Sequence, residues 1–372
     1  MTDAVQSSAP AQAARSGEWV DRLRIGAEYL VIPIFAVLVS AALFSIFLLF
    51  LGKDPLDFYA LLWRGGFGTA FSWQNTLLRS APLILTALCV ALPARAGLVI
   101  IGGEGALVLG GLAAAMVALP FGGGGPAIVV MPMMALAAAI AGAIWIGLVG
   151  VLRHSRGVNE TISSLLLSYI AIALMNFMVE GPLRDPASAN KPSTADIGAG
   201  AMVGKIPGMD VHWGLVWGIV LAVILYVLVN RTTYGFALRV TGGNVRAARA
   251  QGLPVGWLMV SCCAIAGACA GLAGYFEVAA IHGKANASLI AGYGFTGILV
   301  AFLARHNPLA VVPVAILFGG IAAAGGLIQR RMGLPDASVL LFQSLIFVVL
   351  LVSETLYGRF AVFRPRAEAD RT

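Results

Sequence analysis

The chain has 372 residues, of which 59% are hydrophobic and only 11% are charged. A soluble domain usually has about 25% charged residues, so the composition excludes a soluble globular protein and indicates a polytopic membrane protein. The net charge of +7 does not indicate a nucleic-acid partner, because membrane proteins collect Lys and Arg in cytoplasmic loops and the chain has no basic–aromatic nucleic-acid motif.

Apolar segments recur along the chain, and each approaches the roughly twenty residues that a membrane-crossing helix needs. The sequence therefore predicts an all-α membrane protein with about ten spans. In chain order they are 29–51, 77–94, 98–119, 127–151, 161–180, 213–230, 257–280, 293–305, 309–328 and 337–355. The pattern is broken or short near 94–103 and 292–305. Such breaks occur at membrane depth where the backbone is buried in protein or lines a cavity.

The distribution of Lys and Arg predicts the orientation of the spans. With the N-terminus inside, 15 of the 24 basic residues fall on the cytoplasmic side and nine outside, which favours cytoplasmic N- and C-termini. We expect a disordered cytoplasmic tail at 1–28, a transmembrane domain at 29–355 and a second cytoplasmic tail at 356–372. An external loop at about 181–212 is either a docking surface or an ordinary solvated loop.

Several kinds of chemistry have no matching motif. The chain has no P-loop, no CxxC pair and no HExxH, so we expect no catalytic residue, no metal site and no cofactor bound by this chain. The sequence "GYGFTG" at 292–297 matches a dinucleotide fingerprint by letter only, since no strand–loop–helix unit surrounds it. Its glycines instead predict a tight bend or close helix packing.

A short basic segment lies in the predicted cytoplasmic loop at about 231–256. Asn244 is placed to cap a helix of about two turns, and Gly252 followed by Pro254 ends it. Arg246 and Arg249 are three residues apart and share one helical face. So short a helix is unstable alone in water, and we expect it to dock on a partner protein or, alternatively, on anionic lipid.

Ionisable residues within a span are costly, at roughly 3 kcal/mol on insertion scales, and so mark function by default. Glu104 and Glu277 are the two that stand out. Each either lines a polar pathway for substrate or is a structural carboxylate that accepts backbone N–H groups at a broken helix end. Four further residues are pathway candidates, each with a plainer alternative as a helix cap or an interfacial residue: Asn159, His282, Tyr293 and Phe295.

The motifs together resemble a known family. The chain contains "RAGLVIIGGEGALVLGGLAAA", "RGVNETISSLLLSYIA", "YGFALRVTGGNVRAARAQGLP", "AGLAGYFEVAAIHG" and "GYGFTGILVAFLARHNPLAVV" in this order. From about residue 75 to 355 it is similar to permease subunits of bacterial ATP-binding cassette importers, within the branched-chain amino acid and ribose-type superfamily. "GGEG" and "GVNE" point to the simple-sugar branch that serves nucleosides.

The resemblance implies a multi-pass permease of the bacterial cytoplasmic (inner) membrane, without its own ATPase site. It implies as partners a cytoplasmic cassette ATPase that holds ATP and magnesium, a like or unlike second permease subunit, an external substrate-binding protein and membrane lipid. It also implies that the basic segment is the helix that couples to the ATPase. The residues assigned to this coupling are Arg239, Gly242, Asn244, Arg246, Ala247, Arg249 and Gly252.

The expected function is transport of a nucleoside or related small polar solute, with a simple sugar as the alternative substrate. The alternative mechanism is a gradient-driven secondary transporter in which Glu277 carries the proton.

Overall fold

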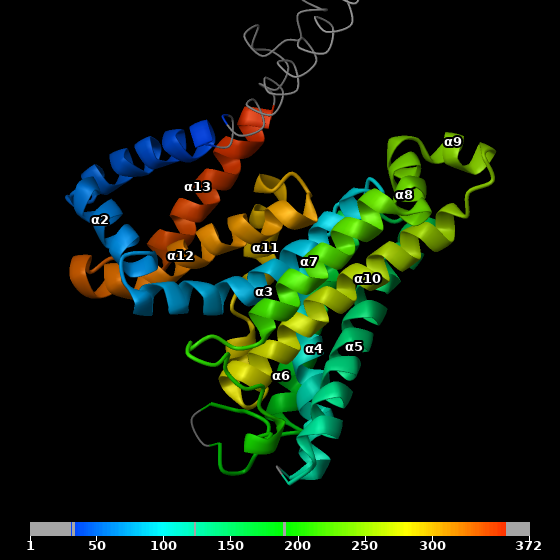
Figure 1. The fold of residues 1–372 in the computed structure, drawn as a ribbon, viewed down its shortest axis with the longest axis horizontal. Helices are drawn as coiled ribbons and strands as arrows, with labels where there is room; N and C mark the ends of the chain where they lie inside the picture. Colours follow the sequence, from blue (N-terminus) through cyan, green and yellow to red (C-terminus); the bar gives the residue numbers. More distant parts are fainter. Residues whose placement is uncertain (1–30, 32–33, 123, 189–190, 355–372) are drawn as a thin grey trace, which may run out of the picture. The chain divides into compact units, whose positions relative to one another are not determined.

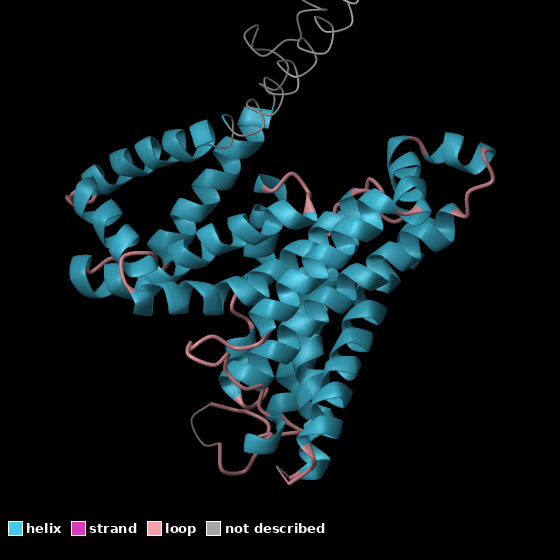
Figure 2. Cartoon of the chain, viewed as in Figure 1, coloured by secondary structure: helices cyan, strands magenta, loops and turns pink. Residues whose placement is uncertain are grey.

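The computed structural model describes residue 31 and residues 34–122, 124–188 and 191–354. Over these residues the chain consists of helices and loops, with isolated bridges but no strand (Figure 2). The described residues form two compact units: a larger one from Asp57 to Val339, and a smaller one made by residues 31–56 and 340–354. The expected tails at 1–28 and 356–372 lie outside the described residues.

The smaller unit is built from the helix Ile34–Phe50 and most of helix α13 (Ala337–Glu354). The Ser40 hydroxyl donates to the Ala36 carbonyl at 2.6 Å and lies 3.3 Å from the Leu345 carbonyl, and the ring centroids of Phe44 and Phe342 are 5.1 Å apart. Phe50 is 87% exposed. Exposed apolar side chains of this size are expected on helices that face lipid.

The larger unit contains the remaining helices, most of which are apolar over their whole length. In chain order they are α2 (Pro55–Gly66), α3 (Ala70–Ala94), α4 (Gly103–Ala118), α5 (Ala127–Arg156), α6 (Glu160–Glu180), α7 (Gly214–Arg231), α8 (Thr233–Gly243), α9 (Val245–Ala250), α10 (Val255–Phe276), α11 (Tyr293–Leu303) and α12 (Pro308–Met332). A π-helix, η3 (Glu277–His282), continues α10, and three short 3-10 turns, η1 (Leu119–Phe121), η2 (Ala199–Ala201) and η4 (Ala287–Leu289), complete the unit.

Each of the ten predicted spans contains an apolar helix, and within the described ranges seven of these helices are long and apolar enough to cross a membrane. Helix α11 has 11 residues, which at a rise of 1.5 Å per residue is about 16 Å, against a hydrocarbon core of about 30 Å. The predicted start at residue 98 is also wrong: residues 98–102 are not helical, and α4 begins at Gly103. The short helix α11 lies at the predicted break near 292–305, and the late start of α4 lies at the predicted break near 94–103.

Glycines let the central helix α10 approach its neighbours closely. A Cβ added to Gly271 would lie 2.1 Å from the Ala138 carbonyl oxygen on α5, and one added to Gly274 would lie 1.9 Å from the Leu107 carbonyl oxygen on α4. Without a hydrophobic force between helices inside lipid, such backbone contact is a principal source of helix association. Helices α4, α5 and α10 therefore form a tightly packed centre in the larger unit.

Two groups of loops lie at different ends of the larger unit (Figure 1). At one end α8 and α9 lie beside residues 95–97, because a Cβ on Gly97 would be 3.2 Å from the Gly242 carbonyl oxygen. At the other end the loop between α6 and α7 pairs with the segment after η3, where the Thr194 N–H donates to the Ala285 carbonyl at 3.0 Å. The sequence analysis assigns the first group to the cytoplasmic side and the second to the external side, and this orientation stays a prediction.

Candidate functional site

A polar cavity of about 320 Å³ lies where α3, the π-helix η3 and the start of α11 meet, beside the loop between α6 and α7. Its lining combines charged, hydroxyl and amide groups with a few apolar side chains. The lining residues are Asn75, Leu78, Arg79, Glu277, Ile281, His282, Ser288, Ala291 and Tyr293. Small-solute sites share this character, in which a few convergent polar groups fix the orientation of the ligand.

The π-helix η3 brings Glu277 and His282 together in this cavity. Residues five apart are turn neighbours in a π-helix, whereas in an α-helix the neighbours are three and four apart. The Nε2 atom of His282 lies 3.5 Å from one carboxylate oxygen of Glu277. The other oxygen, Oε1, is buried and has no hydrogen-bond partner among the described residues. A buried acceptor without a partner is costly, and this marks Glu277 as a candidate polar group of the site.

Tyr293 also lines the cavity, but Glu104 does not. Glu104 is completely buried behind it, at the start of α4, where its two oxygens accept the backbone N–H groups of Gly292 at 2.8 Å and Gly294 at 2.5 Å. Gly292 has φ +78 and is the N-cap residue of α11. The glycines of "GYGFTG" thus make a bend and a close helix contact, as the sequence predicts, and Glu104 is placed as a structural carboxylate.

The remaining two pathway candidates lie elsewhere. Asn159 caps α6 by accepting the Ile162 N–H at 3.1 Å, at the end of that helix away from the cavity. Phe295 lies half-buried on α11 and does not line the cavity. Of the six candidates, the structure therefore groups Glu277, His282 and Tyr293 at the cavity, with Glu104 directly behind them.

Sequence reasoning missed Arg79 and Asn75 as cavity residues. The predicted span begins at residue 77, and Arg79 enters the sequence analysis only as one of the nine basic residues counted outside. Helix α3 in fact begins at Ala70, so Asn75 and Arg79 are four apart on one helical face and both line the cavity. The polar i, i+4 pair directly before the apolar run was the signal that would have found them.

The basic segment forms the short helix that the sequence predicts. The Asn244 side chain accepts the N–H groups of Arg246 at 2.9 Å and Ala247 at 3.1 Å, and Gly252 follows the helix with φ +76. The side chains of Arg246 and Arg249 are exposed. Helix α9 therefore presents two cations on a small, capped helix.

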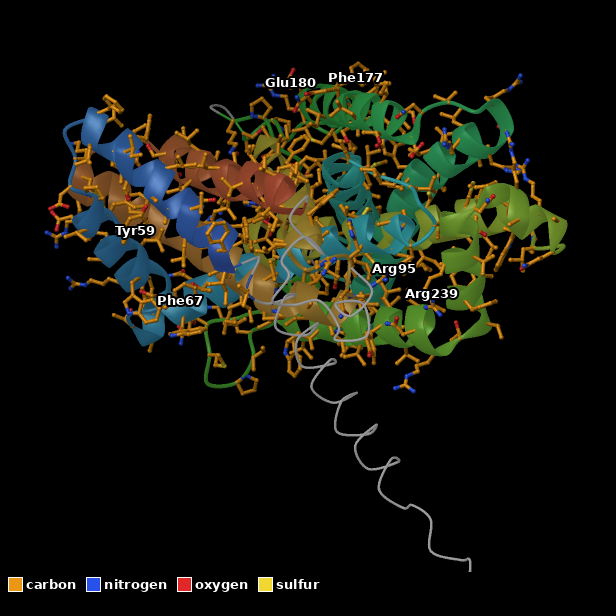
Figure 3. All side chains as sticks on the ribbon, turned by 90° about the horizontal axis from the view of Figure 1, so that it is seen from above. Tyr59, Phe67, Arg95, Phe177, Glu180 and Arg239 are labelled. Carbon is orange, nitrogen blue, oxygen red and sulfur yellow. The ribbon has the colours of Figure 1, made fainter. Side chains whose placement is uncertain are left out.

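Helix α8 joins this basic helix to the non-helical segment 95–102. A Cβ on Gly242 would lie 2.4 Å from the Arg95 carbonyl oxygen, so the two backbones touch. The Arg239 guanidinium donates to the Val229 carbonyl and lies near Arg95 (Figure 3). Burial and this neighbouring cation hold the pKa of Arg95 below its usual value. Arg95 in turn donates to the His306 carbonyl at 2.9 Å.

Helix α6 holds the far part of the same segment. The Thr161 hydroxyl donates to the Val99 carbonyl at 2.9 Å, and the Ser164 hydroxyl accepts the Ile101 N–H at 3.0 Å. These bonds satisfy backbone groups that a helix would otherwise pair, as is required inside a membrane. Contacts thus run without interruption from α8, through residues 95–102, to the first turn of α4.

Comparison with known proteins gives a family-level match. The family model described as the permease component of branched-chain amino acid transport systems matches residues 72–353. This range includes the cavity, the break at 95–102 and the basic segment.

Several proteins that are named as transporter permeases are similar to this chain over most of its length. A glucose ABC transporter permease of Haloferax volcanii is 34% identical over 333 residues, which are 87% of each chain. A guanosine ABC transporter permease of Bacillus subtilis is 31% identical over 348 residues, covering 90% of this chain and 96% of the relative. A nucleoside ABC transporter permease of Lactococcus lactis subsp. cremoris is 26% identical over 347 residues, covering 91% and 94%. The relatives differ in the substrate that their names give.

Proposed function

The chain belongs to the family of branched-chain amino acid transport system permease components, and from this membership we propose that it forms the translocation pathway of an ATP-driven importer. It is an ABC transporter permease and a multi-pass membrane protein. The observation that carries the proposal is a polar cavity, with an unpartnered carboxylate oxygen on Glu277, that is joined by continuous contacts to an exposed basic helix. The membrane is the bacterial inner membrane.

The proposed substrate is a nucleoside or a related small polar solute. Two of the relatives described above are named for guanosine or nucleosides. The cavity offers the Tyr293 ring for a flat base, and the Glu277 carboxylate and the Ser288 hydroxyl for ribose hydroxyls. A simple sugar is the second candidate, because the relative from Haloferax volcanii is named for glucose and hydroxyl recognition needs the same polar groups.

The proposed partner at α9 is a cytoplasmic cassette ATPase, which holds ATP and magnesium, so that this chain contributes transport and no catalysis. Exposed Arg246 and Arg249 favour an acidic groove, and the capped helix presents them in fixed positions. Anionic lipid is the alternative partner for this face. A second permease subunit, like or unlike, completes the pathway.

An external binding protein is the proposed partner at the opposite end. The loop between α6 and α7 is held against the cavity mouth, where the Ile197 N–H donates to the Gly283 carbonyl at 2.9 Å and Lys191 bonds the hydroxyl of Ser288, a lining residue. A protein docked on this loop would release its solute beside the cavity. The permease then needs only weak contacts with the solute, because the binding protein sets the affinity.

The proposed mechanism is alternating access. Closure of the ATPases moves α8 and α9, and the contact of Gly242 with residues 95–97 passes the movement to the packed helices. The rival is a gradient-driven transporter in which Glu277, beside His282, carries a proton. That protein would work without an ATPase.

The test is to reconstitute the chain with candidate ATPases and a binding protein, and to compare wild type with Arg246→Glu/Arg249→Glu. The matched control is Arg330→Glu/Arg331→Glu, which reverses two exposed arginines at the end of α12. We expect uptake of labelled nucleoside to require ATP, and only the α9 variant to lose ATPase co-purification. Uptake by the chain alone on a proton gradient, with the α9 variant unaffected, would refute the importer and favour the rival.

A further inference from the structure

Glu104 is a buried charge with an unusual set of partners. It is 0% exposed and makes no ion pair with any residue that the structure describes. An unpaired buried carboxylate is costly unless hydrogen bonds satisfy it. Here each oxygen accepts one backbone N–H, from Gly292 and from Gly294. The carboxylate therefore ties the first turn of α4 to the start of α11.

The two donors are the residues on either side of Tyr293. The Tyr293 carbonyl lies 3.0 Å from the Thr86 hydroxyl, whose one proton it shares with the Pro82 carbonyl at 2.9 Å. A Cβ on Gly294 would lie 2.1 Å from the Glu104 backbone nitrogen, so the two segments touch along the backbone. Tyr293, which lines the cavity, is therefore positioned from the α4 side mainly by the carboxylate of Glu104.

The start of α4 is also the end of the segment that α8 contacts. Gly242 touches the backbone of residues 95–97, and Gly102 lies so close to Ser164 that a Cβ would be 3.0 Å from the Ser164 Cβ. Only Gly103 separates Gly102 from Glu104. A displacement of α8 can therefore reach Glu104 through the continuous backbone of residues 95–104. Glu104 then connects this backbone to the segment that holds Tyr293 in the cavity.

We propose that Glu104 is a positioning residue that couples the basic helix α9 to the cavity, by transferring movement of residues 95–102 to Tyr293. The inference rests on the proposed function, because it assumes that an ATPase acts on α9. It assigns Glu104 no contact with substrate. Its role is to make the position of Tyr293 depend on the position of α8.

Both oxygens of Glu104 are needed as acceptors. In Glu104→Gln the side chain keeps its size, but the amide has one acceptor oxygen and an NH₂ group that faces a backbone N–H. One of the two bonds to the segment 292–294 is then lost. Glu104→Asp keeps the charge and both acceptor oxygens, but its side chain is shorter by one methylene. It therefore weakens the hydrogen bonds to Gly292 and Gly294 by lengthening them.

The experiment uses the assembled transporter in lipid nanodiscs, with its ATPases and the nucleoside-loaded binding protein. The readout is the ratio of stimulated to basal ATP hydrolysis, together with uptake in vesicles. For Glu104→Gln we expect the ATPases to co-purify and basal hydrolysis to persist, while the stimulation ratio falls about tenfold, as loss of one hydrogen bond to a charged group predicts. A normal stimulation ratio with normal uptake would overturn the proposal.

A double-mutant cycle with Gly242→Ala separates coupling from simple damage. If both positions act along one route, the double variant should be no worse than the more severe single variant. Additive losses would show that the two act separately, which would also overturn the proposal. If Glu104→Gln fails to assemble, Glu104→Asp must show the same loss of stimulation for the proposal to stand.

Failure of the proposed function has a different signature. Then the α9 double variant retains its ATPases, and no ATP-dependent stimulation exists for any variant.

Discussion

Two glycines of α5 face α10 with very different amounts of room. A Cβ on Gly142 would lie 2.1 Å from the Gly267 carbonyl oxygen, whereas one on Gly147 would lie 3.5 Å from the Ala264 Cβ. The first distance is far inside van der Waals contact, and the atom it meets is backbone, so α5 and α10 must separate to admit Gly142→Ala. The second distance is an ordinary contact, so Gly147→Ala is the matched control.

The magnitude follows from two opposing effects. Alanine is favoured over glycine within a helix by about 0.8–1 kcal/mol, and both variants gain this equally. Overpacking costs about 1–3 kcal/mol and falls on Gly142→Ala alone. We therefore expect the two variants to differ by about 1–3 kcal/mol in stability, or by roughly 2–6 °C in Tm at about 2 °C per kcal/mol.

The assay is thermal unfolding of the purified permease in one detergent at one scan rate, followed by tryptophan fluorescence. Gly147→Ala should melt at or above the wild-type temperature and Gly142→Ala below it. If the two variants melt together, or if their order is reversed, the close approach of α5 and α10 does not limit stability and the reasoning is refuted.

Two further predictions concern the cavity end. Glu277→Gln should lower nucleoside uptake about tenfold, since a hydrogen bond to a charged acceptor becomes one to a neutral acceptor, while ATPase co-purification is retained; unchanged uptake in vesicles would contradict a role in the pathway. Burial lowers the pKa of His212 from 6.5 to about 4, so between these values the unfolded chain binds a proton that the folded chain does not. The stability that neutral His212 contributes is present above about pH 6.5 and is lost as the pH falls towards 4, so His212→Gln should flatten the drop in Tm over this window; an equally steep drop would show that other groups cause it.

Much of the fold was predictable because neighbouring residues along the chain determine where helices form and end. The low charge and the apolar runs identified the helices of a membrane protein, and Asn244 and Gly252 marked both ends of the basic helix. The break near residue 94 was visible as a weak place in the pattern. The exact start of α4 at Gly103 was not, because residues 98–102 are as apolar as a helix and are held out of one by Ser164 and Thr161.

The site was only partly predictable. Glu277 and His282 were both pathway candidates from the sequence. Their pairing depends on the π-helix η3, which the residue pattern did not predict. Arg79 reached the cavity because α3 starts earlier than its apolar run. For Glu104 the sequence left two roles open, a pathway residue or an acceptor of backbone N–H groups at a broken helix end, and it did not identify Gly292 and Gly294 as the donors.

The sequence by itself therefore determined the class of protein, the helices and the basic capped segment, because composition, periodicity and capping act over a few neighbouring residues. The tertiary structure alone decided that Glu104 binds Gly292 and Gly294, and that Gly97 meets Gly242. These partners are far apart along the chain, and their contact depends on how glycine-lined helices pack inside the membrane, where a shift of a few tenths of an ångström decides whether a hydrogen bond forms.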